Sequence, residues 1–246
     1  MKRKKIWFIL SILAVFILAV ACSGQEDAEK ADTAKVDLEE LKTPAEESNW
    51  EKTTSSEEVI DFCQTVADNS EGRIILDTTT FKTEFDTPIP YMIVSDKAPE
   101  SPEDVPEDKG VVYVNCNIHS GEVEGKEAMM IFAREVAQGK HDDLLKDLVV
   151  IIVPNNNPDG NDDLDKNRIE TQFTPKLVGT RSEGNGLNIN RDMTKLESAC
   201  ARAIVQLMND WNPILFIDAH ATDGSYMRHA VTYNWGLNAG TDPELL

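Results

Sequence analysis

The sequence predicts an α/β fold in which a mixed, largely parallel central sheet carries helices on both faces. Three short apolar runs, at residues 111–114, 148–153 and 214–217, predict the central strands. Each run is apolar at every position, which is typical of strands that are covered on both faces. Two longer segments with apolar residues at helical spacing separate the runs. Strand and helix therefore alternate, as they do around a parallel sheet.

Before these strands, the folded part is expected to begin near Ser55. Ser55 and Glu58 have the spacing of a helix capping box, and an apolar stripe follows at residues 59–66. Two β-like segments come next, at residues 73–78 and 90–94.

The helix after the first central strand carries its apolar side chains on one side and is expected to end at Gly139. The helix before the last strand is expected to open with a capping box at Thr194 and Glu197. Its apolar stripe continues to Trp211.

Residues 1–21 are expected to be a lipoprotein signal peptide. Four basic residues precede an apolar run, at residues 6–21, that is somewhat short for a transmembrane helix. Cys22 follows small residues directly, as in a bacterial lipobox, where the cysteine is acylated. An ordinary signal peptide and an uncleaved anchor are the alternatives. The sequence thus predicts a lipid-anchored protein of the bacterial cell envelope, facing outside the cytoplasm.

Residues 22–58 predict an acidic, disordered tether to a domain at residues 59–246. Positions 23–58 hold 12 acidic and 4 basic residues and almost no bulky apolar ones, so they offer little surface to bury. The whole chain has a formal net charge of −20, which becomes −24 without the four basic residues of the leader. This charge argues against nucleic acid or anionic lipid as a direct partner.

Three cysteines remain after Cys22, and an odd number excludes full intrachain pairing. Cys116 and Cys200 lie in apolar settings, so they are expected to be core residues.

Candidate metal ligands follow two of the three central strands. Ligands of such a sheet bind beyond the carboxyl ends of its strands. His119 and Glu122 come after the first strand, where Gly121 is expected to permit a tight turn, and His220 comes after the third. The His-x-x-Glu spacing of His119 and Glu122 is a weak signal alone, because it also arises by chance. His220 is weak alone because a lone histidine is more often structural. Together they offer three ligands, the number that a catalytic zinc ion needs beside its open position.

Two further segments complete a recognisable order of motifs. Asn-Pro-Asp-Gly follows the second strand at residues 157–160, and residues 179–192 contain Gly-Thr-Arg and Gly-Leu-Asn-Ile-Asn-Arg-Asp. With His-Ser-Gly-Glu before them and Asp-Ala-His after them, the chain resembles the zinc metallocarboxypeptidases of the carboxypeptidase A type over roughly residues 83–224. The resemblance implies that His119, Glu122 and His220 bind one zinc ion.

The resemblance also implies roles in substrate binding. Asn190 and Arg191 would hold the terminal carboxylate of a peptide, a planar group that a guanidinium binds well. An arginine would stabilise the oxyanion; Arg181 is the first choice and Arg168 the second, with a solvated surface arginine as the alternative for either. The segment at 157–160 is expected to be a turn that shapes the site.

The chain departs from the family pattern in two ways. Asn188 stands where the family commonly has an aspartate that orients a ligand histidine; its amide oxygen can still accept the hydrogen bond, without the charge. The family's general-base glutamate lies several dozen residues after the third ligand, but only 26 residues follow His220, and Glu244 does not fit the role. We therefore expect a C-terminally truncated fold that lacks its last strands, exposes an apolar edge and is inactive alone.

The leading interpretation is hydrolysis of C-terminal peptide bonds by zinc-activated water. The alternatives are an amidase acting on cell-wall peptides or other acyl-amino compounds, and a non-catalytic lipoprotein that binds zinc or peptide.

Overall fold

The structure is a computed structural model that describes residues 36–169, 172–221, 229 and 231–233. The predicted leader at residues 1–21 and the lipidation site Cys22 lie outside these residues. Within the described part of the chain, no helix combines the length and apolarity needed to cross a membrane.

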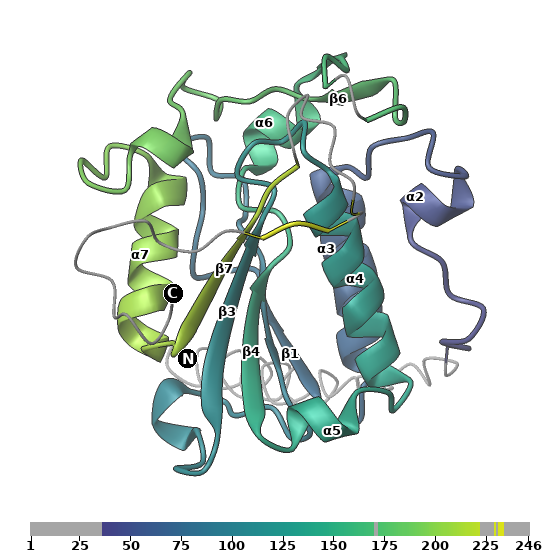
Figure 1. The fold of residues 1–246 in the computed structure, drawn as a ribbon, viewed down its shortest axis with the longest axis vertical. Helices are drawn as coiled ribbons and strands as arrows, with labels where there is room; N and C mark the ends of the chain where they lie inside the picture. The colour runs from purple at the N-terminus through teal and green to yellow at the C-terminus, as the bar shows by residue number, and fades with distance from the viewer. Residues whose placement is uncertain (1–35, 170–171, 222–228, 230, 234–246) are drawn as a thin grey trace, which may run out of the picture. The chain divides into compact units, whose positions relative to one another are not determined.

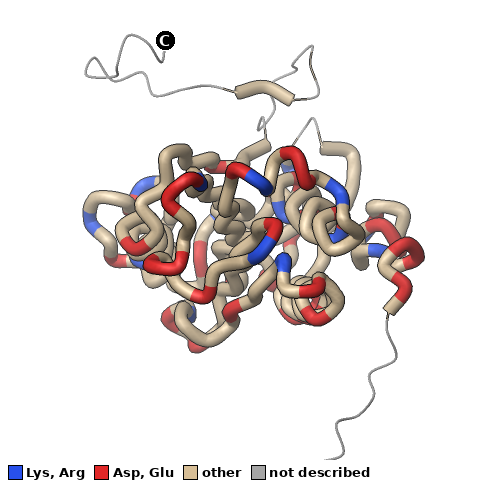
Figure 2. The backbone as a smooth tube through the Cα atoms, turned by 90° about the horizontal axis from the view of Figure 1, so that it is seen from below, with Lys and Arg blue, Asp and Glu red and all other residues tan. Residues whose placement is uncertain are grey.

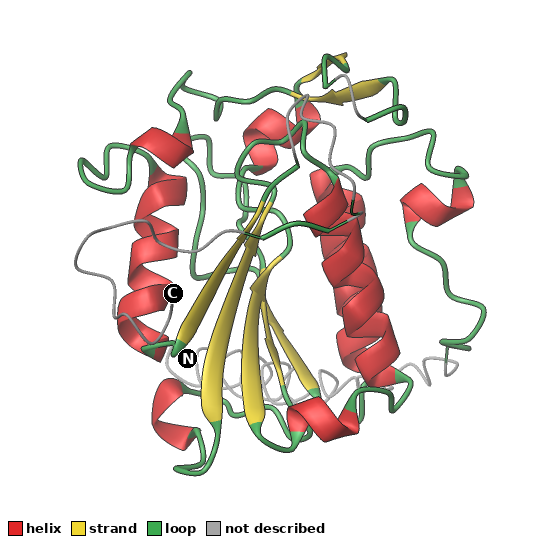
Figure 3. Cartoon of the chain, in the orientation of Figure 1, coloured by secondary structure: helices red, strands yellow, loops and turns green. Residues whose placement is uncertain are grey.

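Five strands form one mixed sheet at the centre of the fold (Figures 1 and 3). Their order is β1 (Ile74–Asp77), β2 (Tyr91–Val94), β4 (Leu148–Val153), β3 (Gly110–Cys116) and β7 (Leu215–Ala219). β4, β3 and β7 are parallel, whereas β1 and β2 are antiparallel to each other and β2 is antiparallel to β4. The predicted mixed, largely parallel sheet is confirmed.

Helices cover both faces of this sheet (Figure 1). α3 (Ser56–Asp68) and α4 (Glu124–Ala137) pack on one face, and α7 (Ala199–Trp211) packs on the other. Side chains alternate along β3, so Val114 belongs to the core under α3 and α4, while Tyr113 belongs to the core under α7. Residues 111–114 of this strand are apolar at every position because they contribute to two cores.

The predicted start of α3 and end of α4 are confirmed. Ser55 and Glu58 form a complete capping box at the start of α3. α4 ends at Ala137, and Gly139 adopts the left-handed conformation (φ 83°) two residues later.

The predicted start of the last helix is wrong. α7 begins at Ala199, and its N-cap is Ser198, whose Oγ accepts a hydrogen bond from the Ala201 N–H at 3.1 Å. Leu196 has a φ of 58°, which is incompatible with a helix, so Thr194 and Glu197 cannot form the expected capping box.

The prediction of a disordered tether is wrong for residues 36–58. Within this stretch we call residues 36–55 the N-terminal arm. It contains the short helix α2 (Pro44–Glu47), which has a complete capping box between Thr43 and Glu46. Glu46 accepts hydrogen bonds from both terminal nitrogens of Arg134 on α4, at 2.6 and 3.1 Å. A charged pair and backbone capping therefore order a segment that has little apolar surface.

Smaller elements occupy the connections around the sheet (Figure 3). β5 and β6 form a separate antiparallel pair. The short elements are η1 (Pro102–Asp104), α5 (Asp142–Leu145), α6 (Pro158–Asp162), β5 (Leu164–Lys166), β6 (Leu177–Gly179) and η2 (Ile189–Arg191).

Cys63, Cys116 and Cys200 are buried free thiols, which confirms the prediction that Cys116 and Cys200 are core residues. Burial raises the pKa of each thiol, to about 12 for Cys63. None of these groups is a thiolate at neutral pH.

β7 exposes apolar side chains, as the sequence led us to expect. Leu215 and Ile217 are 51% and 42% exposed, and Ile214, directly before the strand, is 76% exposed. Among the described strands, β7 pairs only with β3. Acidic residues are distributed around the folded part, with basic residues between them (Figure 2).

Candidate metal centre

The loop after β3 carries the first two predicted ligands. Asn117 takes the left-handed conformation (φ 61°), which turns the chain away from the strand. A tight turn then follows, in which the Glu122 N–H donates to the His119 carbonyl at 2.9 Å. Gly121 is favoured for a different reason from the one expected: a Cβ there would lie 3.3 Å from the carbonyl oxygen of Gly179, so a side chain would require a small shift of that backbone. Its role is close approach between two backbone segments.

The parallel pairing of β3 and β7 brings the third ligand to the same place. Cys116, the last residue of β3, pairs with Ala219, so His220 emerges beside the loop that follows β3. The Nδ1 atom of His119 lies 2.8 Å from Oε1 of Glu122, and Nδ1 of His220 lies 2.9 Å from Oε2. Ligand atoms of the three residues all lie within 4.8 Å of one another. The structure thus brings the three predicted ligands together.

Each histidine uses its second nitrogen to contact an oxygen outside the cluster. Nε2 of His119 lies 3.3 Å from Oδ1 of Asn188, and Nε2 of His220 lies 2.9 Å from Oδ2 of Asp218. Asn188 therefore contacts a predicted ligand histidine, at the position where we expected an orienting residue. Such contacts fix the tautomer and orientation of a ligand ring.

Sequence reasoning did not assign a role to Asp218. Its carboxylate also accepts a hydrogen bond from Nδ2 of Asn115, at 3.3 Å. A signal was available: Asp218 is an acidic residue at the end of an apolar strand, and residues two apart in a strand point to the same side, so it faces the side of His220.

The contacts within the cluster favour a negatively charged Glu122 and a positively charged His220. Burial raises the pKa of Glu122, but hydrogen bonds with His119 and His220 outweigh burial and lower the pKa to about 2. Hydrogen bonds with Asp218 and then Glu122 raise the pKa of His220 to about 9, against the effect of burial. A divalent cation would supply the same positive charge. Two imidazoles and one carboxylate are also a ligand set that catalytic zinc uses, so these residues fit the ion.

A cavity of about 350 Å³ opens beside the cluster. Its walls come from the loop after β3 and from the region of β5 and β6, and they include His119, Glu122, Arg168, Thr180 and Arg181. Nη1 of Arg181 lies 3.5 Å from Oε1 of Glu122. The Arg168 side chain is 80% exposed and pairs with Asp165 at 2.8 Å. Of the two candidate arginines, Arg181 is therefore the one that contacts the cluster.

Asn190 and Arg191 lie in η2, directly after Asn188. A terminal nitrogen of Arg191 donates to the Asn190 carbonyl at 2.7 Å. Among the described contacts, none joins either side chain to His119, Glu122 or His220, and neither residue lines the cavity beside the cluster. Their predicted role in carboxylate binding stays a prediction.

The segment at residues 157–160 starts helix α6 and is more than the expected turn. Oδ1 of Asn157 caps the helix by accepting from the Gly160 N–H at 3.0 Å. Its backbone carbonyl accepts from the Ser120 hydroxyl at 2.9 Å. The segment therefore contacts and supports the loop at residues 117–122, next to His119. We call this loop the metal loop.

The sequence profile described as zinc carboxypeptidase matches residues 60–199, more than half of the chain. The chain belongs to the zinc carboxypeptidase family. The matched stretch contains two of the three clustered residues, His119 and Glu122. No curated protein sequence matches the chain significantly.

Solved structures of carboxypeptidases share the fold of this zinc carboxypeptidase family member. A protein assigned as carboxypeptidase A from Shewanella denitrificans is 20% identical, with a TM-score of 0.55 over 72% of this chain and 42% of its own. A metallo-carboxypeptidase from Burkholderia cenocepacia is 19% identical, with a TM-score of 0.50 over 68% of this chain and 41% of its own. The chain therefore spans about two fifths of the length of these two structures. From the sequence we expected no general-base glutamate after His220 and gave Glu244 no such role. Both predictions concern residues 221–246, most of which lie outside the described residues.

Proposed function

We propose that this chain supplies the zinc-binding part of a carboxypeptidase that hydrolyses C-terminal peptide bonds. The observation that carries the proposal is the convergence of His119, Glu122 and His220 within 4.8 Å, in a chain of the zinc carboxypeptidase family. The neighbouring cavity gives a peptide access to the cluster. The partner is a peptide with a free terminal carboxylate, and the cofactor is one zinc ion.

Zinc at this site would polarise the scissile carbonyl and acidify a bound water. The residues of the chain would then have separate tasks. Asn188 and Asp218 hold the two histidine rings in place. Arg181, at the cavity wall, offers its guanidinium to the developing oxyanion. Asn190 and Arg191 are proposed to bind the terminal carboxylate, for which the planar guanidinium is suited.

Zinc binding by the purified chain tests this proposal. We expect one zinc ion per chain, measured by elemental analysis after dialysis, and its loss in His119→Ala and His220→Ala. His141→Ala is the matched control, because this histidine pairs with Glu135 at 2.8 Å and is not in the cluster. Equal zinc content in all four proteins would contradict the proposal.

Substrate class is tested on the natural full-length protein. We expect hydrolysis of a peptide with a free C-terminus, little hydrolysis of the same peptide as a C-terminal amide, and a raised KM for the free acid in Arg191→Ala. A cell-wall peptide serves as the third substrate. Preference for that peptide regardless of its C-terminal carboxylate would favour the amidase alternative.

We also propose that the protein is anchored in a bacterial cell envelope by lipid on Cys22. The basic and apolar leader and the small residues before the cysteine support this proposal. Expressed in bacteria, the protein should partition into detergent, and its N-terminal peptide should carry the mass of a lipid. Cys22→Ser should abolish the lipid mass, whereas Ser23→Ala should keep it. A lipid mass that persists on the N-terminal peptide of Cys22→Ser would contradict lipid anchoring at this residue.

A further inference from the structure

A fully buried lysine lies under the metal loop. Lys126 is on the first turn of α4 and has no exposed surface. Its ammonium donates to the Thr54 carbonyl and to Oδ1 of Asn161, both at 2.7 Å. Lysine is almost never fully buried without partners, and here both acceptors come from other segments of the chain. The ammonium thus joins α4 to the N-terminal arm and to α6.

The side-chain amide of Asn161 also connects Lys126 to the metal loop. Nδ2 of Asn117 donates to Oδ1 of Asn161 at 3.0 Å and to Oδ1 of Asn155 at 2.7 Å. Asn117 is the left-handed residue of the loop, two positions before His119. Only two hydrogen bonds therefore separate the ammonium from the backbone turn that directs the metal ligands.

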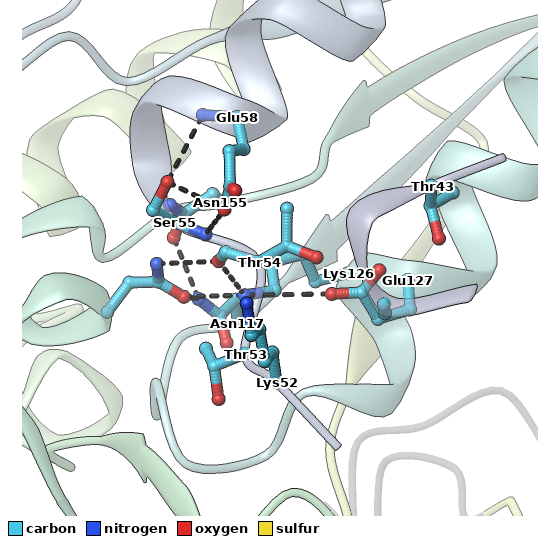
Figure 4. A network of polar contacts seen from close by, with 12 residues as sticks. Thr43, Lys52, Thr53, Thr54, Ser55, Glu58, Asn117, Lys126, Glu127 and Asn155 are labelled. Carbon is cyan, nitrogen blue, oxygen red and sulfur yellow. Dashed lines mark hydrogen bonds and ion pairs between the residues drawn. The ribbon is translucent and has the colours of Figure 1, made fainter. Parts of the chain in front are cut away.

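The N-terminal arm completes this network (Figure 4). The Thr54 carbonyl accepts from Lys126 and also from Nδ2 of Asn161, at 3.0 Å. Directly after the arm, Ser56 at the start of α3 accepts from Nδ2 of Asn155 at 3.0 Å. Thr54 lies before residues 60–199, the part that matches the family profile. The arm therefore adds a contact from outside the matched region to the support of the metal loop.

The charge in this network is costly. The nearest carboxylate oxygen, Oε1 of Glu127, is 3.9 Å from the ammonium, and both oxygens of that buried carboxylate lack a hydrogen bond of ordinary geometry. A buried ion pair of this kind is often no more stable than an apolar pair of similar volume. Stability alone does not account for Lys126, so a role in fixing local conformation is the better explanation.

We propose that Lys126 is a positioning residue for the metal centre. Its ammonium, through Asn161 and Asn117, holds the loop that presents His119 and Glu122, and the N-terminal arm closes the network. The inference rests on the proposed zinc-binding function of the cluster. Lys126 contacts neither the ion nor the substrate, so its effect is on the affinity and geometry of the site.

The first test replaces Lys126 by methionine in the full chain. Lys126→Met keeps the length of the side chain and removes its charge and hydrogen bonds. We expect zinc affinity to fall on the order of 10-fold, as for other residues that orient metal ligands, and the visible spectrum of the cobalt-substituted protein to change. Thermal stability should fall, because the buried carboxylate of Glu127 and two hydrogen-bond acceptors lose their partner, so affinity and spectrum are measured below the unfolding transition. Met130→Leu, one turn further along α4 and equally buried, is the control and should keep wild-type affinity and spectrum.

The second test covers the case in which Lys126→Met does not fold. Asn117→Gly keeps the left-handed turn and removes the amide that links the loop to Asn161. It should also weaken zinc binding about 10-fold. Asn212→Gly is the matched control, an asparagine with φ of 43° at the end of α7, and should bind zinc as the wild type does.

The outcomes separate this inference from the proposed function. Wild-type zinc affinity and a wild-type cobalt spectrum in Lys126→Met, or in Asn117→Gly where Lys126→Met does not fold, would overturn the positioning role while leaving the zinc site intact. Failure of the wild-type chain to bind zinc would overturn the proposed function and, with it, this inference.

Discussion

Each histidine of the cluster turns Nδ1 towards Glu122 and Nε2 towards a separate oxygen, but the two outer oxygens differ in charge. His220 has the carboxylate of Asp218 at 2.9 Å, whereas His119 has the neutral amide of Asn188 at 3.3 Å. A carboxylate makes a ligand imidazole more basic, and an amide does so less. The two residues should therefore contribute unequally to metal affinity.

Removing Asp218 should cost more than removing Asn188. We expect Asp218→Ala to weaken zinc binding by about 10- to 100-fold and Asn188→Ala by less, because the first contact is shorter and charged. Competition with a chromogenic chelator measures both affinities. The reverse order would show that Asp218 does not orient His220.

Adding a charge at position 188 should strengthen the site. Asn188→Asp keeps an oxygen that can accept from His119 and from the Asn190 N–H, which now donates to Oδ1 at 3.0 Å. Zinc affinity should rise, by up to about 10-fold, in the same competition assay. A lower affinity would mean that the added charge repels Glu122 more than it supports His119.

At this scale the sequence was informative where residues follow strand ends. His119, Glu122 and His220 could be placed together because β3 and β7 are parallel and their carboxyl ends share one edge of the sheet. The network of Lys126 could not be predicted, because its acceptors lie 72 and 35 residues away in the chain and leave no local pattern.

Among the elements, α7 shows how a local motif can mislead. Thr194 and Glu197 have capping-box spacing, yet the helix starts after Ser198. The deciding contacts are tertiary: the Ser198 N–H donates to Asp192 at 2.7 Å, and its hydroxyl donates to the buried carboxylate of Glu183 at 2.6 Å. The apolar stripe of α7 was predicted correctly because periodicity is a property of the helix itself.

The two caps can be compared by mutation. Ser198→Ala should lower the free energy of unfolding by about 2 kcal/mol, because it removes an N-cap and a hydrogen bond to a buried carboxylate. Thr194→Ala, at an exposed position, should change it by less than about 0.5 kcal/mol. Urea unfolding at neutral pH measures both. Equal losses would contradict the observed start of α7.

For the whole molecule, the N-terminal arm is the main difference between expectation and structure. Its composition is acidic and poor in apolar residues, which predicted a tether. The order comes from Glu46, which accepts from the Thr43 N–H at 2.8 Å as well as from Arg134. The Thr43-Pro44-x-Glu46 capping box was visible in the sequence, but the contact with Arg134, 88 residues away, was not.

Docking of the arm should depend on pH. Burial raises the pKa of Glu46, but the hydrogen bonds from Arg134 and Thr43 outweigh it, so the pKa lies below its ordinary value. The stabilisation is therefore present above the unfolded-state pKa of about 4.5 and is lost as pH falls through the folded-state pKa. Glu46→Gln should be less stable than the wild type by about 1 kcal/mol at pH 7, and the difference should shrink towards zero in acid.

Urea unfolding of both proteins from pH 7 to pH 3 measures this difference. Glu47→Gln is the control, since it removes the same charge from the neighbouring exposed residue and should have little effect at either pH. A gap between wild type and Glu46→Gln that persists unchanged at pH 3 would show that the ionised carboxylate does not hold the arm.

The most direct measurement of the central claim is an anomalous difference map, recorded at the zinc absorption edge from crystals of the zinc-loaded protein. The proposed site predicts one strong peak at coordination distance from Nδ1 of His119, the carboxylate of Glu122 and Nδ1 of His220. A map without a peak between these three side chains, or with its only peak elsewhere, would contradict it.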